Sequence, residues 1–193
     1  MIINTFQYAA SRLQVLLVDN FFPDDLLEEL LIMCVTSETH PDDWEYAEWT
    51  NKRKIHKGNT DTYRKLEQTL SDSTFLSELA QWPQSFGRPP LRMQFIECKV
   101  WADYPGFGTL NAHTDNTPHI QGQIFLTRNT HKTNGTSMMS PSKELLFTLP
   151  YRNNYGWVMQ DCRETMHSRE FDTVPNTVRY SVIFWHYYEE IPQ

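Results

Sequence analysis

The sequence predicts an α+β fold in which helices cover one face of a β-sandwich or jelly roll. Two observations support this prediction. Apolar residues recur with helical periodicity within residues 1–90, whereas β-branched and aromatic runs divided by proline, glycine and asparagine fill residues 91–193. A chain of 193 residues suits a single domain. We therefore expect residues 1–90 to be mainly helical support and residues 91–193 to form the β core that carries a site.

The individual elements follow from local patterns. Residues 13–18 form a short apolar run that predicts a strand. Pro23 and two aspartates then precede a segment through Cys34 whose leucines recur with the helical period, which predicts a helix with one apolar face. Two shorter helices are expected at residues 61–70 and 73–82. The strands expected after residue 90 are 93–101, 121–126, 145–148, 156–159 and 179–188.

The composition limits the compartment and the partners. The three cysteines are an odd number, widely spaced and without a CxxC pair, which argues against both a disulfide framework and a thiolate zinc site. No stretch is typical of a signal peptide or approaches the roughly 20 apolar residues that cross a bilayer. We therefore expect a cytoplasmic protein without membrane contact. The formal net charge of -7 disfavours nucleic acid as a partner.

A short basic run interrupts this acidic composition directly after an acidic stretch, and its residues are Lys52, Arg53, Lys54, His56 and Lys57. The simpler interpretation is a solvated loop or hairpin. The other interpretation is a loop that faces the substrate and recognises acidic groups. The sequence leaves both open.

A candidate metal site begins with His113 and Asp115. Residues two apart on an extended strand point to the same face, so the imidazole and the carboxylate would lie together. His167 lies far along the chain, beyond several expected strands, and is the candidate third ligand. Two histidines and one carboxylate on one face of a metal leave other coordination positions open, which is the arrangement of non-haem iron(II) sites.

This ligand set has alternatives, because an isolated HxD pair is a weak signal. His113 could be a turn or core histidine bonded to the nearby carboxylate, and His167 a surface histidine. His119 could complete a local site with His113 and Asp115, although Pro118 interrupts the strand alternation there. The remaining histidines, which we interpret as structural, are His40, His56, His131 and His186.

A second signal is an arginine inside an apolar strand. Residues 178–185 are nearly continuously apolar, with Arg179 as the one charged residue. A buried guanidinium needs an anion, and its planar fork matches a carboxylate in a bidentate manner. Ser181 shares the face of Arg179 and could donate a further hydrogen bond. The alternative is an edge-strand arginine paired with an internal acid such as Glu97.

With these residues in place, the sequence resembles the 2-oxoglutarate-dependent oxygenases, and within them the prolyl hydroxylase branch that includes the hypoxia-factor prolyl hydroxylases. The tyrosine-proline-glycine loop at residues 104–109, ahead of the HxD strand, is similar to that branch. So is His167 followed by the arginine-tyrosine strand at residues 177–185. The resemblance is dense from residue 94 to residue 188 and only general before that.

The resemblance implies a double-stranded β-helix, a cupin-like jelly roll, with the N-terminal helices packed on one sheet. It implies iron(II) bound by the ligands His113, Asp115 and His167. It also implies that Arg179 binds the distal carboxylate of 2-oxoglutarate and that Tyr104 lines the cosubstrate pocket near the proximal carboxylate. Dioxygen would be the co-reactant, with ascorbate as an added reductant.

Further expectations concern the surroundings of this site. Residues 124–126 offer no hydroxyl where the hypoxia-factor enzymes place a second tyrosine, and Ser181 could substitute for it. Residues 128–140, with a turn at Asn134-Gly135, are a candidate flap over the site. Three aromatic residues would be either walls of the site or ordinary core residues: Trp101, Tyr180 and Trp185.

Together these features predict an iron(II)- and 2-oxoglutarate-dependent dioxygenase that hydroxylates a C–H bond. By resemblance, a prolyl residue of a protein or peptide is the first choice of substrate, ahead of another protein side chain or a free amino acid. We expect a protein or peptide partner rather than a small molecule. Two other classes remain open: a non-catalytic domain that binds 2-oxoglutarate or metal, and a zinc- or manganese-dependent cupin-like enzyme, which would not need Arg179.

Overall fold

The computed structural model describes residues 2–7, 14–37, 39–81, 91–107, 113–114, 120–131, 135–140, 142–160, 166–169 and 177–190. Within these ranges the strands form one eight-stranded and one three-stranded sheet. Strand order is β1-β2-β9-β6-β11-β5-β4-β3 in the larger sheet and β10-β7-β8 in the smaller one, and neighbouring strands pair antiparallel.

The elements have the following bounds. The larger sheet contains β1 (Ile2–Gln7), β2 (Gln14–Asp19), β3 (Trp44–Tyr46), β4 (Arg53–His56), β5 (Leu91–Asp103), β6 (Ile120–Leu126), β9 (Tyr155–Gln160) and β11 (Arg179–Glu190). The smaller sheet contains β7 (Thr136–Met139), β8 (Leu145–Thr148) and β10 (Met166–Arg169). The helices are α1 (Asp24–Val35), α2 (Asp61–Ser71) and α3 (Thr74–Gln81), with a short 3-10 helix at Pro41–Asp43.

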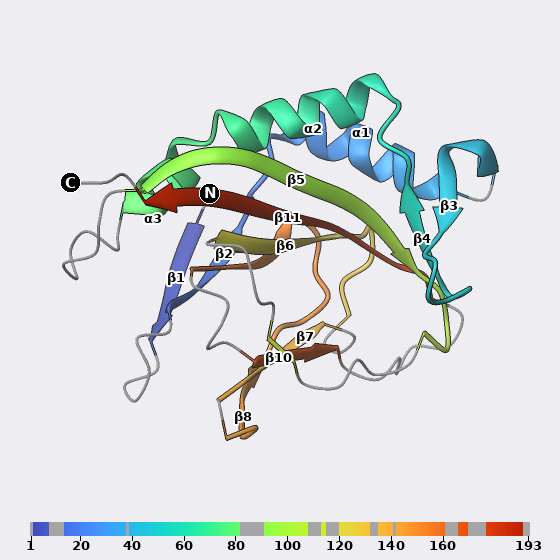
Figure 1. Ribbon diagram of the computed structural model, residues 1–193. Coiled ribbons are helices and arrows are strands. Elements are labelled where there is room, and N and C mark those ends of the chain that lie inside the picture. The colour runs from blue at the N-terminus through green and yellow to red at the C-terminus, as the bar shows by residue number, and fades with distance from the viewer. Residues whose placement is uncertain are drawn as a thin grey trace.

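The helices lie against one face of the curved larger sheet, and the smaller sheet lies on the other side (Figure 1). This arrangement confirms the predicted α+β jelly roll with N-terminal helices on one sheet. Residues 1–90 also supply strands β1 to β4 to the larger sheet, and β2 among them is the strand expected at residues 13–18. None of the helices in the described ranges is long and apolar enough to span a membrane.

Two apolar cores lie on opposite faces of the larger sheet. The first packs the apolar faces of the helices, including Leu30 and Leu66, against residues such as Phe184. The second lies on the side of the smaller sheet and includes Phe125 and Trp157. Because side chains alternate along a strand, each central strand contributes to both sides.

The strand β11 is central, since it pairs with β5 on one edge and with β6 on the other. Val182 and Phe184 point into the helix-side core. Arg179 and Ser181 are out of phase with them and point to the opposite face. The alternation of this strand therefore positions its polar residues between the two sheets.

The predicted flap at residues 128–140 is wrong for its second part. Thr136–Met139 is the strand β7, in the centre of the smaller sheet between β10 and β8. Thr136, Ser137 and Met138 are buried. Their positions are fixed by pairing and burial, so this segment is a wall of the fold and not a lid.

His186 gives the stability of the fold a pH dependence. Its side chain is buried near Phe184 and Tyr188, and burial lowers the pKa of the imidazole to about 4. The unfolded chain has a histidine pKa of about 6.5, so the unfolded state binds the proton more readily. Above pH 6.5 the titration of His186 therefore does not change the free energy of unfolding. Below that pH the free energy of unfolding decreases, by about 3 kcal/mol at pH 4.

The free energy of unfolding from urea titrations across this pH range tests the prediction. His186→Phe should flatten the loss of stability between pH 6.5 and pH 4. The exposed His40 provides the control, because His40→Ala should keep the wild-type slope. An unchanged slope in His186→Phe contradicts the assignment.

Candidate active site

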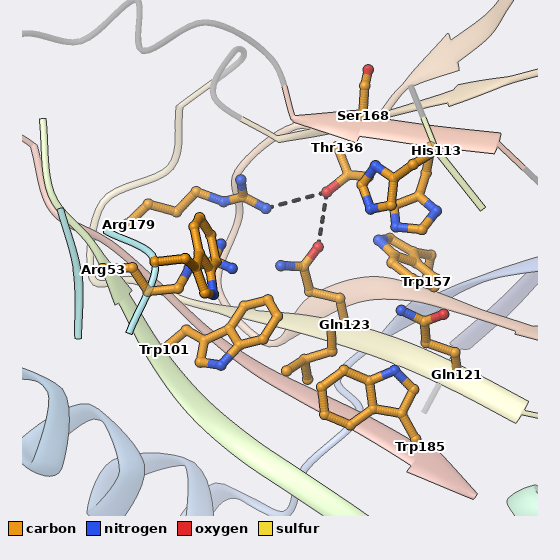
Figure 2. Close-up of a pocket in the computed structure, with 13 residues that line it drawn as sticks. Arg53, Trp101, His113, Gln121, Gln123, Thr136, Trp157, Ser168, Arg179 and Trp185 are labelled. Carbon is orange, nitrogen blue, oxygen red and sulfur yellow. Dashed lines mark hydrogen bonds between the residues drawn. The ribbon is translucent and has the colours of Figure 1, made fainter. Parts of the chain in front are cut away.

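A cavity of about 220 Å³ lies on the side of the larger sheet that faces away from the helices. Among the described residues, its lining includes two histidines, two arginines and four tryptophans, from both sheets (Figure 2). Pockets for drug-sized ligands usually measure about 300–1,000 Å³. The cavity therefore suits a small acid and one further group.

His113 and His167 lie directly opposite each other as an antiparallel pair. The N–H of His113 donates to the carbonyl oxygen of His167 over 3.1 Å, and the reverse hydrogen bond measures 2.9 Å. Side chains at such opposed positions share one face. The imidazole centroids are 4.5 Å apart, and both residues line the cavity. Two predicted ligands from distant segments are thus brought together.

The third predicted ligand, Asp115, and its competitor His119 lie outside the described residues. Within the described ranges, no group of three histidine, cysteine, aspartate or glutamate side chains is placed to hold a metal ion. The paired imidazoles themselves fit a transition-metal site, because imidazole suits iron, copper, nickel and zinc. The HxD spacing keeps Asp115 as the expected third ligand.

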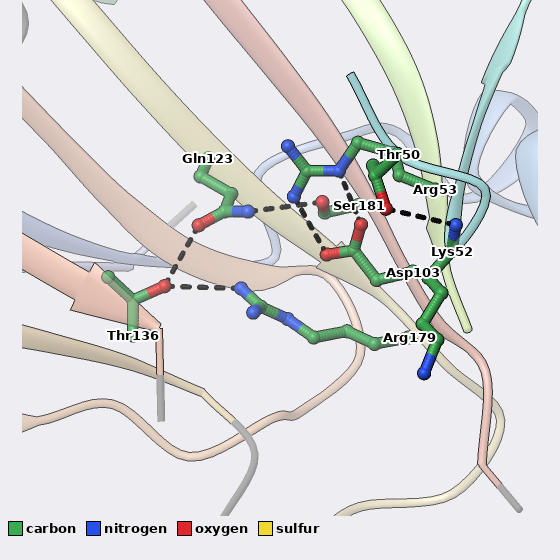
Figure 3. A network of polar contacts seen from close by, with 8 residues as sticks. All are labelled: Thr50, Lys52, Arg53, Asp103, Gln123, Thr136, Arg179 and Ser181. Carbon is green, nitrogen blue, oxygen red and sulfur yellow. Dashed lines mark hydrogen bonds and ion pairs between the residues drawn. The ribbon is translucent and has the colours of Figure 1, made fainter. Parts of the chain in front are cut away.

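Arg179 begins a chain of buried polar contacts across the cavity (Figure 3). Its Nη2 donates to Oγ1 of Thr136 over 3.2 Å, and that hydroxyl donates to Oε1 of Gln123 over 2.9 Å. The Nε2 of Gln123 then donates to Oγ of Ser181 over 3.1 Å. Arg179, 2% exposed, is therefore held at a defined position beside hydroxyl and amide groups.

The alternative interpretation of Arg179 is wrong. Its strand β11 lies inside the larger sheet and is not an edge. Glu97, the suggested internal acid, pairs instead with Lys99 over 2.9 Å, and both side chains are substantially exposed. Arg179 is a cavity residue.

A second buried arginine was not expected. Arg53 of β4 is 4% exposed and lines the cavity, and it forms an ion pair with Asp103, which is fully buried. Its Nε donates to Oδ1 over 2.5 Å and its Nη2 to Oδ2 over 3.0 Å. The predicted hairpin is present as β3 and β4, but the solvated interpretation of the basic run is wrong for Arg53. Arg53 can be buried because it pairs with Asp103, which is distant in the sequence.

Aromatic rings surround the Arg53 guanidinium. Its Cζ lies 3.8 Å from the ring centroid of Trp101, 4.3 Å from that of Phe107 and 5.4 Å from that of Trp49. Such stacking fixes the plane of a guanidinium. Trp101 and Trp185 are cavity walls, as one of the two interpretations expected.

Known proteins share this fold. No protein-family model matches the chain, and no curated protein matches its sequence significantly. A Pseudomonas putida prolyl-4-hydroxylase matches with a TM-score of 0.66 at 15% identity, over 90% of this chain and 91% of that one. A prolyl hydroxylase from Trichoplax adhaerens, in complex with a hypoxia inducible factor peptide fragment, gives 0.60 at 12% identity, over 90% and 83%. The chain therefore shares the fold of these two hydroxylases.

A third oxygenase-fold structure carries a different chemistry. The non-haem α-ketoglutarate-dependent epimerase SnoN, from nogalamycin biosynthesis, matches with a TM-score of 0.62 at 15% identity, over 92% of this chain and 80% of that one. SnoN has also been solved in complex with Fe3+, α-ketoglutarate and nogalamycin RO. The double-stranded β-helix and the predicted resemblance are thus confirmed at the level of the fold, at identities that leave the substrate open.

Tyr104, which the resemblance implied beside the cosubstrate, packs outside the described lining of the cavity. Its ring packs against the helix-side core, with Nζ of Lys54 5.2 Å from the ring centroid. Tyr180 packs in the same core and its hydroxyl lies 3.1 Å from Oγ of Ser37. The predicted role of Tyr104 beside the cosubstrate has no support in this structure.

The sequence interpretation missed three polar residues that line the cavity, namely Gln121, Gln123 and Thr136, and it missed the ion pair of Arg53 with Asp103. One usable signal was present. Gln121 and Gln123 alternate with apolar residues in a strand that is otherwise apolar, and period-two polarity in a buried strand marks a face that meets a ligand or a network.

Proposed function

We propose that the protein is an iron(II)- and 2-oxoglutarate-dependent dioxygenase that hydroxylates a C–H bond. The observation that supports this most is the pairing of His113 and His167 on one wall of a cavity that also contains the buried Arg179. The shared fold supports it independently.

The proposed ligands of iron(II) are His113, His167 and Asp115. Imidazoles from two paired strands and a carboxylate on one face leave coordination positions for a bidentate cosubstrate and dioxygen. When bound, iron and 2-oxoglutarate supply the oxidising chemistry. The protein holds these groups in place.

The proposed anchor of the distal carboxylate is Arg179, because a planar guanidinium binds a carboxylate through two parallel hydrogen bonds. Thr136 and Gln123 hold the guanidinium and offer further polar groups beside it. Residues 124–126 offer no hydroxyl for the cosubstrate, and in this proposal Thr136 of β7 supplies one. Ser181 joins the same network by accepting a hydrogen bond from Gln123.

For the substrate, we propose a prolyl residue of a protein or peptide. The residue motifs and the likeness to two prolyl hydroxylase structures support this choice. Another protein side chain or a free amino acid is the second choice. A small-molecule substrate is the remaining class, because SnoN, which has a similar fold, has been solved with nogalamycin RO bound.

Succinate production tests the proposed function. Purified protein with iron(II), ascorbate and 2-oxoglutarate should form succinate slowly even without substrate. A non-catalytic binding domain forms none. Mass spectrometry of candidate proline-containing peptides should then show a gain of one oxygen atom.

Thr136→Val should weaken 2-oxoglutarate binding without disturbing the iron. The substitution keeps the side-chain shape and removes the hydroxyl that accepts from Arg179 and donates to Gln123. Loss of one such hydrogen bond costs about 1 kcal/mol, so we expect the KM for 2-oxoglutarate to rise about fivefold, with kcat nearly unchanged.

The matched control is Ser137, the next residue of the same strand, whose hydroxyl pairs with Thr148 over 2.9 Å. Ser137→Ala should leave the KM for 2-oxoglutarate at the wild-type value. Equal effects of the two substitutions would assign the change to β7 as a whole and not to the Thr136 hydroxyl.

A further inference from the structure

The cavity contains two buried guanidinium groups arranged around one carboxylate. Asp103 lies opposite Arg53 on β4 and opposite Arg179 on β11. Residues at opposed positions share one face of a sheet, and Figure 3 shows the carboxylate between the two arginines. The carboxylate bonds Arg53 through two hydrogen bonds, whereas Nη2 of Arg179 reaches Thr136.

The ion pair leaves Arg53 with hydrogen-bond donors but little net charge. A guanidinium carries five N–H donors, and Asp103 accepts from Nε and from Nη2. In the part of the chain that the structure describes, no hydrogen bond from Nη1 is present. A second anion at Nη1 would meet the nearby carboxylate of Asp103 in a poorly screening interior. A neutral oxygen can accept the same hydrogen bond without that repulsion.

The surroundings of Arg53 suit an apolar group that carries such an oxygen. The guanidinium is held in place by the rings of Trp101 and Phe107. Trp49, which also lines the cavity, is 62% exposed. Large exposed aromatic residues beside a cavity commonly contact ligands.

We propose that Asp103 divides the cavity into two subsites of different charge preference. Arg179 is the subsite for a carboxylate. Arg53, neutralised by Asp103, is a recognition group for a neutral acceptor oxygen of the substrate, such as an amide carbonyl next to an apolar ring. The inference rests on the proposed function, since it presumes that the cosubstrate is the dicarboxylate at Arg179. Asp103 thereby keeps 2-oxoglutarate away from Arg53 and selects an amide-linked residue over a free acid.

Two probes that differ in one charge test this division: N-acetylprolinamide, which is neutral, and N-acetylproline, which carries a carboxylate. Their dissociation constants are measured calorimetrically on full-length protein loaded with nickel(II) and 2-oxoglutarate, which prevents turnover. The wild type should bind the amide at least fivefold more tightly than the acid. Asp103→Asn restores the charge of Arg53, so the ratio of the two constants should shift about tenfold or more toward the acid.

Two further variants keep the test decisive. The double variant Arg53→Gln, Asp103→Asn removes both charges and the guanidinium, and it should weaken amide binding about fivefold or more while 2-oxoglutarate binding is retained. This result is expected even where Asp103→Asn alone does not fold. Glu97→Gln breaks another ion pair of β5, with Lys99, and should leave the ratio unchanged.

The results that overturn the division are equally distinct. It is wrong when the probe ratio of Asp103→Asn stays within about twofold of wild type, when the double variant keeps wild-type amide affinity, or when the wild type binds neither probe. Failure of the proposed function has a different signature. In that case wild-type protein with nickel(II) does not bind 2-oxoglutarate at all, and both proposals fall.

Discussion

His167→Ala is expected to abolish succinate formation and to remove bound iron. His167 is 7% exposed and its backbone pairs with His113 in both directions, so removing the ring takes away one of two adjacent nitrogen ligands. Loss of groups that merely orient a metal ligand already costs about 10–100-fold in affinity or activity. We expect a loss of at least a hundredfold in iron affinity, measured by metal analysis after dialysis.

The control for this prediction is His40→Ala, which removes an exposed imidazole outside the cavity. It should keep the iron content and turnover of the wild type. Far-ultraviolet circular dichroism of both variants excludes loss of fold as the cause. Wild-type turnover in His167→Ala would exclude the proposed ligand set, and His113→Ala and Asp115→Ala should match His167→Ala.

Arg179→Met is expected to raise the 2-oxoglutarate requirement while iron stays bound. Methionine preserves much of the apolar stem of the side chain but cannot bind a carboxylate. Removing one partner of a buried, hydrogen-bonded charge pair costs about 2–5 kcal/mol. The KM for 2-oxoglutarate should therefore rise at least about thirtyfold, with a smaller effect on kcat.

An exposed arginine provides the control for Arg179→Met. Arg92 pairs with Glu189 at the surface, with 72% of its side chain exposed, and Arg92→Met should leave the KM unchanged. An unchanged KM in Arg179→Met would instead move the carboxylate anchor to another cation, of which Arg53 is the candidate inside the same cavity.

The helices and central strands could be predicted because their patterns are local. Leucines at helical spacing predict α1, which runs from Asp24 to Val35, and the apolar residues 124–126 predict the second half of β6. The strand β7 could not be predicted in this way. Its residues Thr136 and Ser137 are polar yet buried, because they complete hydrogen bonds with Gln123 and Thr148 from other strands. Only the tertiary structure supplies those partners.

The same distinction between local patterns and distant partners explains which residues of the site could be predicted. The histidine and aspartate of the HxD pair are two residues apart, and side chains at that spacing point to the same face of an extended strand. His113 could therefore be identified from the sequence. Arg53 could not, because it lies in a basic run and its burial depends on Asp103, a residue of another strand. Tyr104 was assigned through resemblance alone, and its ring packs in the helix-side core. Residues whose role depends on a distant partner are thus the ones that local patterns miss.

The most direct test of the iron and cosubstrate assignment is an anaerobic titration of 2-oxoglutarate into the protein loaded with iron(II). Chelation of the iron by the 2-oxo acid should produce a visible charge-transfer band that saturates at one equivalent per chain, and Arg179→Met should need a higher concentration for the same band. A zinc- or manganese-dependent enzyme of this fold gives no such band. Absence of the band from correctly folded wild-type protein that retains iron would contradict the account.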